Sequence, residues 1–310
     1  MGKRPEERTV DELLRLGVIN LDKPSGPTSH QVSAWVKKIL NVERAGHGGT
    51  LDPRVTGVLP VALMESTRAL QALLAGDKEY VGVLRLHQDV ERKRVEEIFS
   101  DFQGEIYQLP PVRSAVKREL RKRTVYELSL LEMDGRDGLF SVRCESGTYI
   151  RTLCNDIGEA LGIGGHMADL RRTRTASFTE RESHTLQELK DAWVAWESEE
   201  DDAPIREVIQ PMERLLDHLP KVQIKDTAVD AICHGADLAV TGISRIEGSF
   251  TKGQLVAILS GKGEGVAIGR TLLTSKEAVS EEGGLGVDTK RVLMEPGTYP
   301  RHWKGSKRSD

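Results

Sequence analysis

The chain has 310 residues, of which 38% are hydrophobic and 30% charged, and its formal net charge is −4. This length suits one large domain or two ordinary ones, and the composition is typical of a globular protein with a charged surface. No apolar run approaches the roughly 20 residues that span a bilayer, and residues 1–13 lack a signal-peptide core. The three cysteines are too few and too scattered for a disulfide framework or a cysteine-based zinc site. We therefore expect a cytoplasmic protein.

The charge is unevenly distributed along the chain. Residues 197–202 read ESEEDD, whereas residues 113–123 read RSAVKRELRKR and hold six basic groups and one acid. A mildly acidic total can therefore accompany a strongly basic surface, and it is the local potential that attracts phosphate. The basic stretch follows two prolines and has no clean period, so we expect a loop or arm there.

The first segments predict a helix, a strand and a second helix. A capping box precedes a short helix that Gly17 ends, and residues 18–21 have the pattern of a strand. Residues 23–29 contain two prolines and a glycine, which predicts a rigid loop. Ser29 is placed to cap the next helix, whose apolar residues follow the stripe of a helix packed on a core.

The stretch Gly46–Pro60, with the sequence GHGGTLDPRVTGVLP, combines a glycine-rich loop with a core strand. Its glycines free the backbone to adopt positive φ, and Pro53 biases Asp52 towards an extended conformation. The apolar run at 58–64 follows at once and indicates a buried strand. A carboxylate thus stands on a loop that a rigid element fixes, as functional groups often do. An ordinary Asx-type turn is the plainer interpretation of the Asp-Pro pair.

Strands and helices then follow without the regular alternation of a βαβ fold. Strands are predicted at 79–87, 124–133 and 139–145, and helices within 66–76, 95–104, 147–162 and 185–196. No dinucleotide-binding or P-loop signature is present. We therefore expect an α+β fold with a mixed, mainly antiparallel sheet and flanking helices.

The composition changes after the acidic run. Residues 204–220 carry three prolines and predict a hinge or a connecting helix. Beyond them, short strands at 238–240, 254–259 and 266–272 are separated by glycines. Short strands with glycine turns predict a small C-terminal β-barrel.

Four motifs in order resemble the motif set of the TruB-type pseudouridine synthases: KPSGPTS at 23–29, GHGGTLDPRVTGVLP at 46–60, KEYVG at 78–82 and GTYIRTLCNDIGEALG at 147–162. The C-terminal region resembles a PUA domain, a compact RNA-binding barrel. The N-terminal extension, the basic arm and the PUA-like region are similar to the archaeal, dyskerin-like form, which is the catalytic subunit of H/ACA guide-RNA particles.

This resemblance divides the chain into four parts. They are an N-terminal extension (1–16) that we expect to pack on the PUA domain, a pseudouridine synthase catalytic domain (17–216), a PUA domain (217–297) and a basic disordered tail (298–310).

The resemblance implies isomerisation of uridine to pseudouridine in RNA, a reaction that needs neither a metal nor an organic cofactor. Asp52 would be the catalytic carboxylate: a nucleophile at C1′, a nucleophile at C6 of the base, or a base towards a ribose proton. The sequence leaves these three routes open. Arg151 would be the ion-pair partner of this carboxylate. Tyr80 would stack on the extruded base and act late as a general acid or base.

The same resemblance assigns supporting residues. Tyr149 would line the pocket, and Lys23 and Pro24 would support the catalytic loop, although a proline-fixed turn explains Pro24 equally. His47 is a further pocket candidate, and an exposed loop histidine is its plainer interpretation. The residues that we expect to contact RNA are Arg113, Lys117, Arg118, Arg121, Lys122, Arg123, Arg171, Arg172, Gly235 and Gly242.

The implied partners are an H/ACA guide RNA, substrate rRNA and tRNA, and small accessory proteins of the particle. Family members also act alone on the T-loop uridine of tRNA. We expect no membrane association and no homo-oligomer. The alternative is a non-catalytic H/ACA RNA-binding scaffold, against which the joint presence of Asp52, Tyr80 and Arg151 argues.

Overall fold

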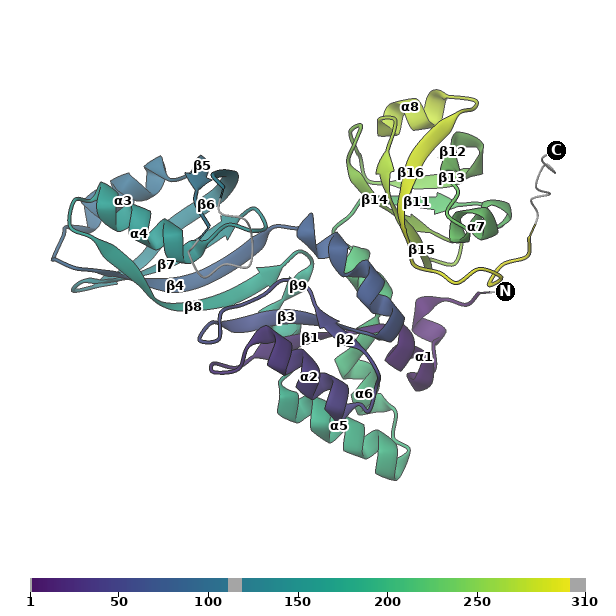
Figure 1. Cartoon of the computed structure of the whole chain (residues 1–310), viewed down its shortest axis with the longest axis horizontal. Coiled ribbons are helices and arrows are strands. Elements are labelled where there is room, and N and C mark those ends of the chain that lie inside the picture. The colour runs from purple at the N-terminus through teal and green to yellow at the C-terminus, as the bar shows by residue number, and fades with distance from the viewer. Residues whose placement is uncertain (1, 111–118, 302–310) are drawn as a thin grey trace.

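The computed structural model describes residues 2–110 and 119–301, and within them the strands form two sheets (Figure 1). The larger sheet contains β1 (Gly17–Lys23), β2 (Ala45–His47), β3 (Thr56–Leu63), β4 (Lys78–Leu86), β5 (Gly104–Gln108), β6 (Arg121–Asp134), β7 (Asp137–Cys144), β8 (Gly165–Thr175), β9 (Phe178–Thr179) and β10 (Ile209–Pro211). The smaller sheet contains β11 (Lys221–Ile224), β12 (Leu238–Ala239), β13 (Ile243–Glu247), β14 (Leu255–Leu259), β15 (Gly265–Thr271) and β16 (Leu285–Val292).

The larger sheet is mixed and mainly antiparallel, as predicted. Its strand order is β10-β1-β3-β8-β4-β7-β6-β5, with β2 added on β3 and β9 on β8. The β3–β8 pair is parallel, whereas β4 runs antiparallel to both β7 and β8. This order places β8, a late strand in the sequence, between two early strands. Strand β8 therefore separates β3, which follows the loop of the 46–60 motif, from β4, which begins with the 78–82 motif, and pairs with both.

Helices accompany both sheets. The α-helices are α1 (Val10–Leu16), α2 (Ser29–Ile39), α3 (Arg92–Asp101), α4 (Ile150–Ala160), α5 (Leu186–Glu199), α6 (Ala203–Val208), α7 (Asp226–Cys233) and α8 (Ser275–Ser280). Short 3-10 helices lie at η1 (Pro5–Glu7), η2 (Met64–Leu74), η3 (Glu180–Glu182), η4 (Met212–Leu216) and η5 (Val240–Gly242). In Figure 1, α3 and α4 cover the part of the sheet around β6 and β8, and α2 and α5 cover the part around β3. None of the helices in the described part of the chain is long and apolar enough to cross a membrane.

Helix starts differ from prediction by small shifts that hydrogen bonds explain. Helix α2 is capped by Thr28 rather than Ser29. The Thr28 side chain accepts a hydrogen bond from the Gln31 backbone amide, and the Gln31 side-chain oxygen accepts one from the Thr28 backbone amide. The predicted helix within 66–76 is the 3-10 helix η2, which already begins at Met64. Ser29 is thereby freed for another role, described below.

Two segments that were not predicted as strands contribute them. Residues 204–220, predicted as a hinge or a connecting helix, contain most of α6 and all of η4, and between these β10 pairs with β1 at the edge of the larger sheet. The last three residues of the basic stretch, Arg121–Arg123, begin β6 and pair with β5. Backbone pairing with a neighbouring strand, which the local sequence does not reveal, decides both cases.

The smaller sheet is curled and carries a core of its own. Its strand order is β12-β16-β15-β14-β11-β13, and α7 packs against β15 and β16. The N-terminal segment reaches it: the Lys3 amide donates to Glu264 Oε1 at 3.1 Å. The Glu264 side chain is buried and also accepts from the Tyr299 hydroxyl and the Ser260 hydroxyl.

Candidate active site

The loop between β2 and β3 carries Asp52 between two buried anchors. Leu51 and Val55 are each 4% exposed and belong to the hydrophobic cluster that also contains Tyr80. The Val55 amide donates to the Asp52 carbonyl at 3.0 Å, which closes a turn. The acceptor is the backbone carbonyl of Asp52 and not its side chain, so this is a backbone turn rather than an Asx turn, and it does not use the Asp52 carboxylate.

Lys23 and Ser29 fix this loop through hydrogen bonds to its backbone. The Lys23 side chain is fully buried, and its Nζ donates to the carbonyls of Pro24, Pro53 and Val55 at 2.8–2.9 Å. The buried Ser29 hydroxyl accepts from the Leu51 amide at 2.9 Å and donates to the Leu51 carbonyl at 3.2 Å. The first motif thus fixes the backbone on both sides of Asp52. The prediction of Ser29 as the cap of α2 is therefore wrong, and its place within the motif at 23–29 is the signal for its contact with the loop.

Arg151, in the first turn of α4, forms an ion pair with Asp52. Its Nη2 contacts Asp52 Oδ2, and the two side chains are 50% and 48% exposed, respectively. The predicted partnership therefore exists, but in an open setting rather than a buried one. Because both side chains are half-exposed, the pair is not a compensation for a buried charge. A substrate can approach this pair from solvent.

Gln108, at the end of β5, positions the start of α4. Its side chain is 2% exposed; the amide nitrogen donates to the Tyr149 carbonyl at 3.1 Å, and the amide oxygen accepts from the Tyr149 backbone N–H at 2.9 Å. Tyr149 is the N-cap residue of α4, directly before Ile150 and Arg151, and is half-buried. Sequence reasoning missed Gln108, whose one signal is its position two residues before Pro110-Pro111.

Tyr80 lies on β4 behind the loop. It is 9% exposed and stands opposite Arg172 of β8 in the antiparallel register. Burial raises the pKa of the Tyr80 hydroxyl, and interaction with the Arg172 guanidinium partly opposes that rise. The hydroxyl is therefore protonated at neutral pH.

His47, on β2, contacts a second histidine rather than Asp52. Its Nε2 lies 3.3 Å from Nδ1 of His30 in α2. Burial, followed by the proximity of His30 and Arg172, lowers the pKa of His47. The imidazole is neutral at pH 7 and joins α2 to the loop at a half-buried position.

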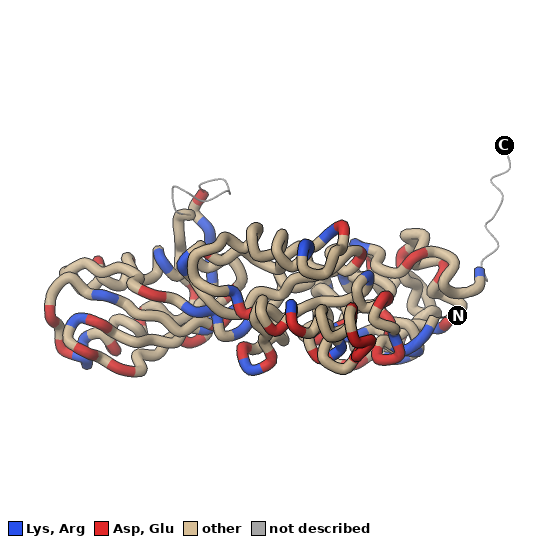
Figure 2. The backbone as a smooth tube through the Cα atoms, turned by 90° about the horizontal axis from the view of Figure 1, so that it is seen from below, with Lys and Arg blue, Asp and Glu red and all other residues tan. Residues whose placement is uncertain are grey.

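Two arginines predicted to contact RNA are occupied within the protein. Arg172 is 2% exposed, and this position corrects its prediction as a surface contact. Arg171 is half-buried, and its guanidinium pairs with Asp22 at 2.9 Å and Glu180 at 2.7 Å. Figure 2 shows Lys and Arg positions interspersed with Asp and Glu along the chain, which suits such pairing. The rule that arginine is a surface residue fails at Arg172, which lies on a central strand.

The other predicted RNA contacts are differently placed. Arg121, Lys122 and Arg123 begin β6; Lys122 pairs with Glu105 on β5, and Arg123 donates to Glu145 at 3.4 Å. Gly235 and Gly242 lie around β12 in the smaller sheet. Their contact with RNA stays a prediction. Arg113, Lys117 and Arg118 lie outside the described residues.

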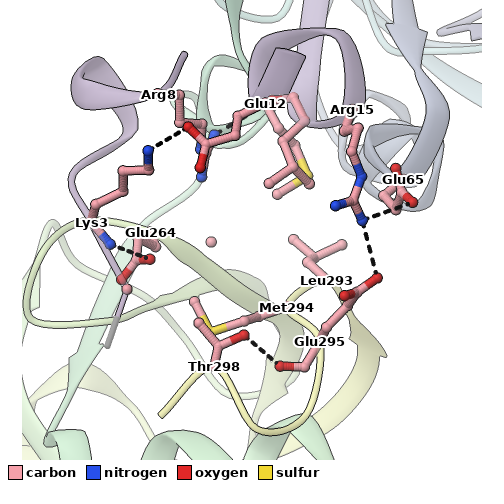
Figure 3. A pocket seen from close by; sticks show the side chains of 14 residues that line it. Lys3, Arg8, Glu12, Arg15, Glu65, Glu264, Leu293, Met294, Glu295 and Thr298 are labelled. Atoms are coloured by element: carbon pink, nitrogen blue, oxygen red, sulfur yellow. Dashed lines mark hydrogen bonds and ion pairs between the residues drawn. The ribbon is translucent and has the colours of Figure 1, made fainter. Parts of the chain in front are cut away.

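A cavity of about 360 Å³ lies elsewhere, where the N-terminal segment meets η4, the start of β15 and the segment after β16 (Figure 3). Positively and negatively charged side chains line this cavity, among them Lys3, Arg15, Glu65 and Glu295. Arg15 bridges Glu65 and Glu295 at 3.3 and 3.5 Å. None of its lining residues belongs to the predicted active site.

Comparison with known families matches four family models to the chain. They are the TruB family pseudouridylate synthase N-terminal domain at residues 37–150, the tRNA pseudouridylate synthase B C-terminal domain at 151–217, the PUA domain at 220–293 and the DKCLD (NUC011) domain at 1–33.

Similar curated proteins span nearly the whole chain. A probable tRNA pseudouridine synthase B from Methanopyrus kandleri is 56% identical over 97% of this chain and 89% of the relative. One of the same name from Methanothermobacter thermautotrophicus is 52% identical over 98% of this chain and 94% of the relative.

Two solved structures match this chain over nearly its whole length. The chain matches a protein in the crystal structure of a Cbf5-Nop10-Gar1 complex with a TM-score of 0.92 and 52% identity, covering 97% of this chain and 92% of the other. It also matches one in a structure of an H/ACA RNP bound to a substrate RNA containing 2′-deoxyuridine, with a TM-score of 0.90, 49% identity and the same coverage. The fold and these matches define an RNA-modifying isomerase. The chain belongs to the TruB family of pseudouridine synthases, and its smaller sheet is a PUA domain.

Proposed function

We propose that Asp52 is the catalytic carboxylate with which this chain converts uridine to pseudouridine. The observation that carries the proposal is the open ion pair between Asp52 and Arg151 on a loop that Lys23 and Ser29 hold rigidly. A uridine in a folded RNA must leave its stack to reach such a carboxylate. The half-exposed position of Asp52 accommodates a base that enters from solvent.

The neighbouring side chains have complementary roles in this proposal. Arg151 orients the Asp52 carboxylate towards the nucleoside. Tyr80, whose hydroxyl is protonated at neutral pH, stacks on the extruded base and donates a hydrogen bond or proton late in the reaction. The reaction breaks the glycosidic C–N bond, turns the base and forms a C–C bond. Attack at C1′, attack at C6 and removal of a ribose proton are all compatible with a carboxylate in this place.

We also propose that the chain works mainly as the catalytic subunit of an H/ACA guide-RNA particle on rRNA. Support comes from its likeness to the proteins solved in a Cbf5-Nop10-Gar1 complex and in an H/ACA RNP bound to a substrate RNA. The guide RNA would select the uridine by base pairing. The PUA domain, including Gly235 and Gly242, would bind the guide RNA. Small accessory proteins would complete the particle in the cytoplasm.

The names of the curated relatives support a second substrate. Because they are called tRNA pseudouridine synthase B, we propose that the chain also modifies the T-loop uridine of tRNA without a guide.

Purified protein, assayed on transcripts with radiolabelled uridine, tests both settings. One arm uses tRNA and protein alone; the other uses an rRNA fragment with and without a matching guide RNA and accessory proteins. We expect pseudouridine in the tRNA arm, and in the rRNA arm when the guide is present. A guide RNA with a scrambled targeting sequence is the control. Binding of guide RNA without pseudouridine in either arm would favour the non-catalytic scaffold.

A further inference from the structure

Arg172 is a buried arginine at the centre of the larger sheet. Its Nε donates to the Val58 carbonyl at 2.8 Å, and its Nη2 donates to the Gly49 carbonyl at 3.2 Å. Val58 lies on β3 after the catalytic loop, and Gly49 lies three residues before Asp52. One guanidinium therefore binds the backbone at both ends of the loop. Arginine is rarely buried in proteins, and here its buried N–H groups are satisfied by backbone carbonyls, so we interpret Arg172 as a structural element of the loop.

The strand register explains why Arg172 also reaches Tyr80. Arg172 is paired with Gly57 of β3 on one side and with Tyr80 of β4 on the other. Directly opposed residues on adjacent strands have neighbouring side chains on the same face. The buried Arg172 guanidinium therefore lies beside the Tyr80 side chain, and its positive charge partly opposes the rise that burial causes in the pKa of the Tyr80 hydroxyl.

We propose that Arg172 is a positioning residue that couples Tyr80 to the loop bearing Asp52. Its positive charge beside the phenol stabilises the negative charge that forms on the Tyr80 oxygen when the hydroxyl gives its proton to the substrate. By holding the Gly49 and Val58 carbonyls, it ties the same tyrosine to the backbone around Asp52. This inference rests on the proposed role of Asp52 and adds a link that the family motifs did not assign.

Other charged and titratable groups around this pair could shift a pH profile and have to be separated from it. His47 of β2 and Lys78 of β4 lie near the guanidinium, and Cys144 of β7 lies near Tyr80. A pH profile of a single variant would therefore mix their effects. A double-mutant cycle isolates the coupling between Arg172 and Tyr80.

The cycle combines Arg172→Met and Tyr80→Phe, with single-turnover pseudouridine formation as the readout and filter binding of the same RNA measured in parallel. Misplacement of the loop and of Tyr80 should lower the rate by about 10- to 100-fold in Arg172→Met. The RNA dissociation constant should change by less than about threefold, because Arg172 does not reach the surface. In the Tyr80→Phe background, the effect of Arg172→Met should shrink markedly, since the coupled hydroxyl is already gone.

Arg174→Met is the matched control. Arg174 lies two residues along β8 but on the other face, because the register shifts between Glu79 and Tyr80, and it pairs with Asp77 and Glu79. Its replacement should leave the single-turnover rate nearly unchanged in both backgrounds. Arg172→Lys is the second variant in case Arg172→Met does not fold: one ammonium cannot reproduce the guanidinium's several contacts, so the rate should fall and the effect should again depend on Tyr80.

Equal rate losses for an Arg172 variant in the Tyr80 and Tyr80→Phe backgrounds would overturn the coupling while leaving the proposed function intact. A wild-type rate in either Arg172 variant would overturn it as well. If wild-type protein forms no pseudouridine, the proposed function fails first, and this inference falls with it. The two failures are therefore distinguishable by the wild-type rate.

Discussion

Gly57 of β3 and Arg172 of β8 are register partners in the parallel pair at the centre of the larger sheet. Gly57 has a φ of +100°, and a Cβ built on it would lie 2.2 Å from the Arg172 carbonyl oxygen. The backbone of β8 therefore approaches β3 more closely than any side chain permits. This approach lets the Arg172 side chain reach the loop that precedes β3.

Replacing Gly57 with alanine should strongly destabilise the protein. The added methyl group meets backbone, which cannot move aside, and the positive φ adds strain. Gly26→Ala is the control, because Gly26 has a similar φ of +112° but open space around its missing Cβ. We expect a loss of about 1–2 kcal/mol in unfolding free energy for Gly26→Ala, and clearly more for Gly57→Ala. If urea denaturation gave the same loss of unfolding free energy for Gly57→Ala and Gly26→Ala, the close contact between Gly57 and β8 would not explain the need for glycine at this position.

Lys23→Met should weaken both the fold and the reaction. The methionine fills similar space but leaves the carbonyls of Pro24, Pro53 and Val55 without their shared donor. The Pro53 carbonyl keeps the Gly26 amide as a donor, whereas the Pro24 and Val55 carbonyls lose the ammonium, so the cost should be on the order of 2 kcal/mol. The single-turnover rate should also fall, since the Pro53 and Val55 carbonyls lie in the loop just after Asp52. Lys37→Met, at an exposed site on α2, should change neither quantity.

Lys78 should make stability depend on alkaline pH. Burial, together with the nearby Arg172 charge, lowers the pKa of Lys78 to about 8, against 10.5 for the free side chain. Between these values the unfolded chain binds more protons than the folded one, so the Lys78 contribution to stability rises with pH. Relative to Lys78→Met, wild-type protein should gain on the order of 3 kcal/mol between pH 7.5 and 10.5.

Urea denaturation of both proteins across that pH range is the measurement, with Lys93→Met, at an exposed site on α3, as the control. Only the difference between wild type and Lys78→Met matters, because the other titrating groups are common to both. Parallel stability curves would show that the Nζ contacts with the Leu73 and Gly76 carbonyls keep the ammonium charged in the folded state.

The sequence was sufficient to identify the fold class and to select Asp52 and Arg151, which the structure brings into contact. Both stand in motifs whose residues are neighbours along the chain. It was insufficient for Arg172, because β8 has an arginine at a buried central position and no alternation of apolar residues that would reveal a strand. Gln108 was missed for a related reason: its contact with Tyr149 joins positions 41 residues apart.

Comparison of wild-type protein with Asp52→Asn tests the central claim most directly. The amide preserves the shape of the side chain but is neither a nucleophile nor a base, so single-turnover pseudouridine formation should fall by at least about 1,000-fold. Binding of the same RNA and thermal stability should stay close to wild type, as should all properties of Asp89→Asn, an exposed carboxylate outside the site. An Asp52→Asn rate within tenfold of wild type would contradict the assignment of Asp52 as the catalytic carboxylate.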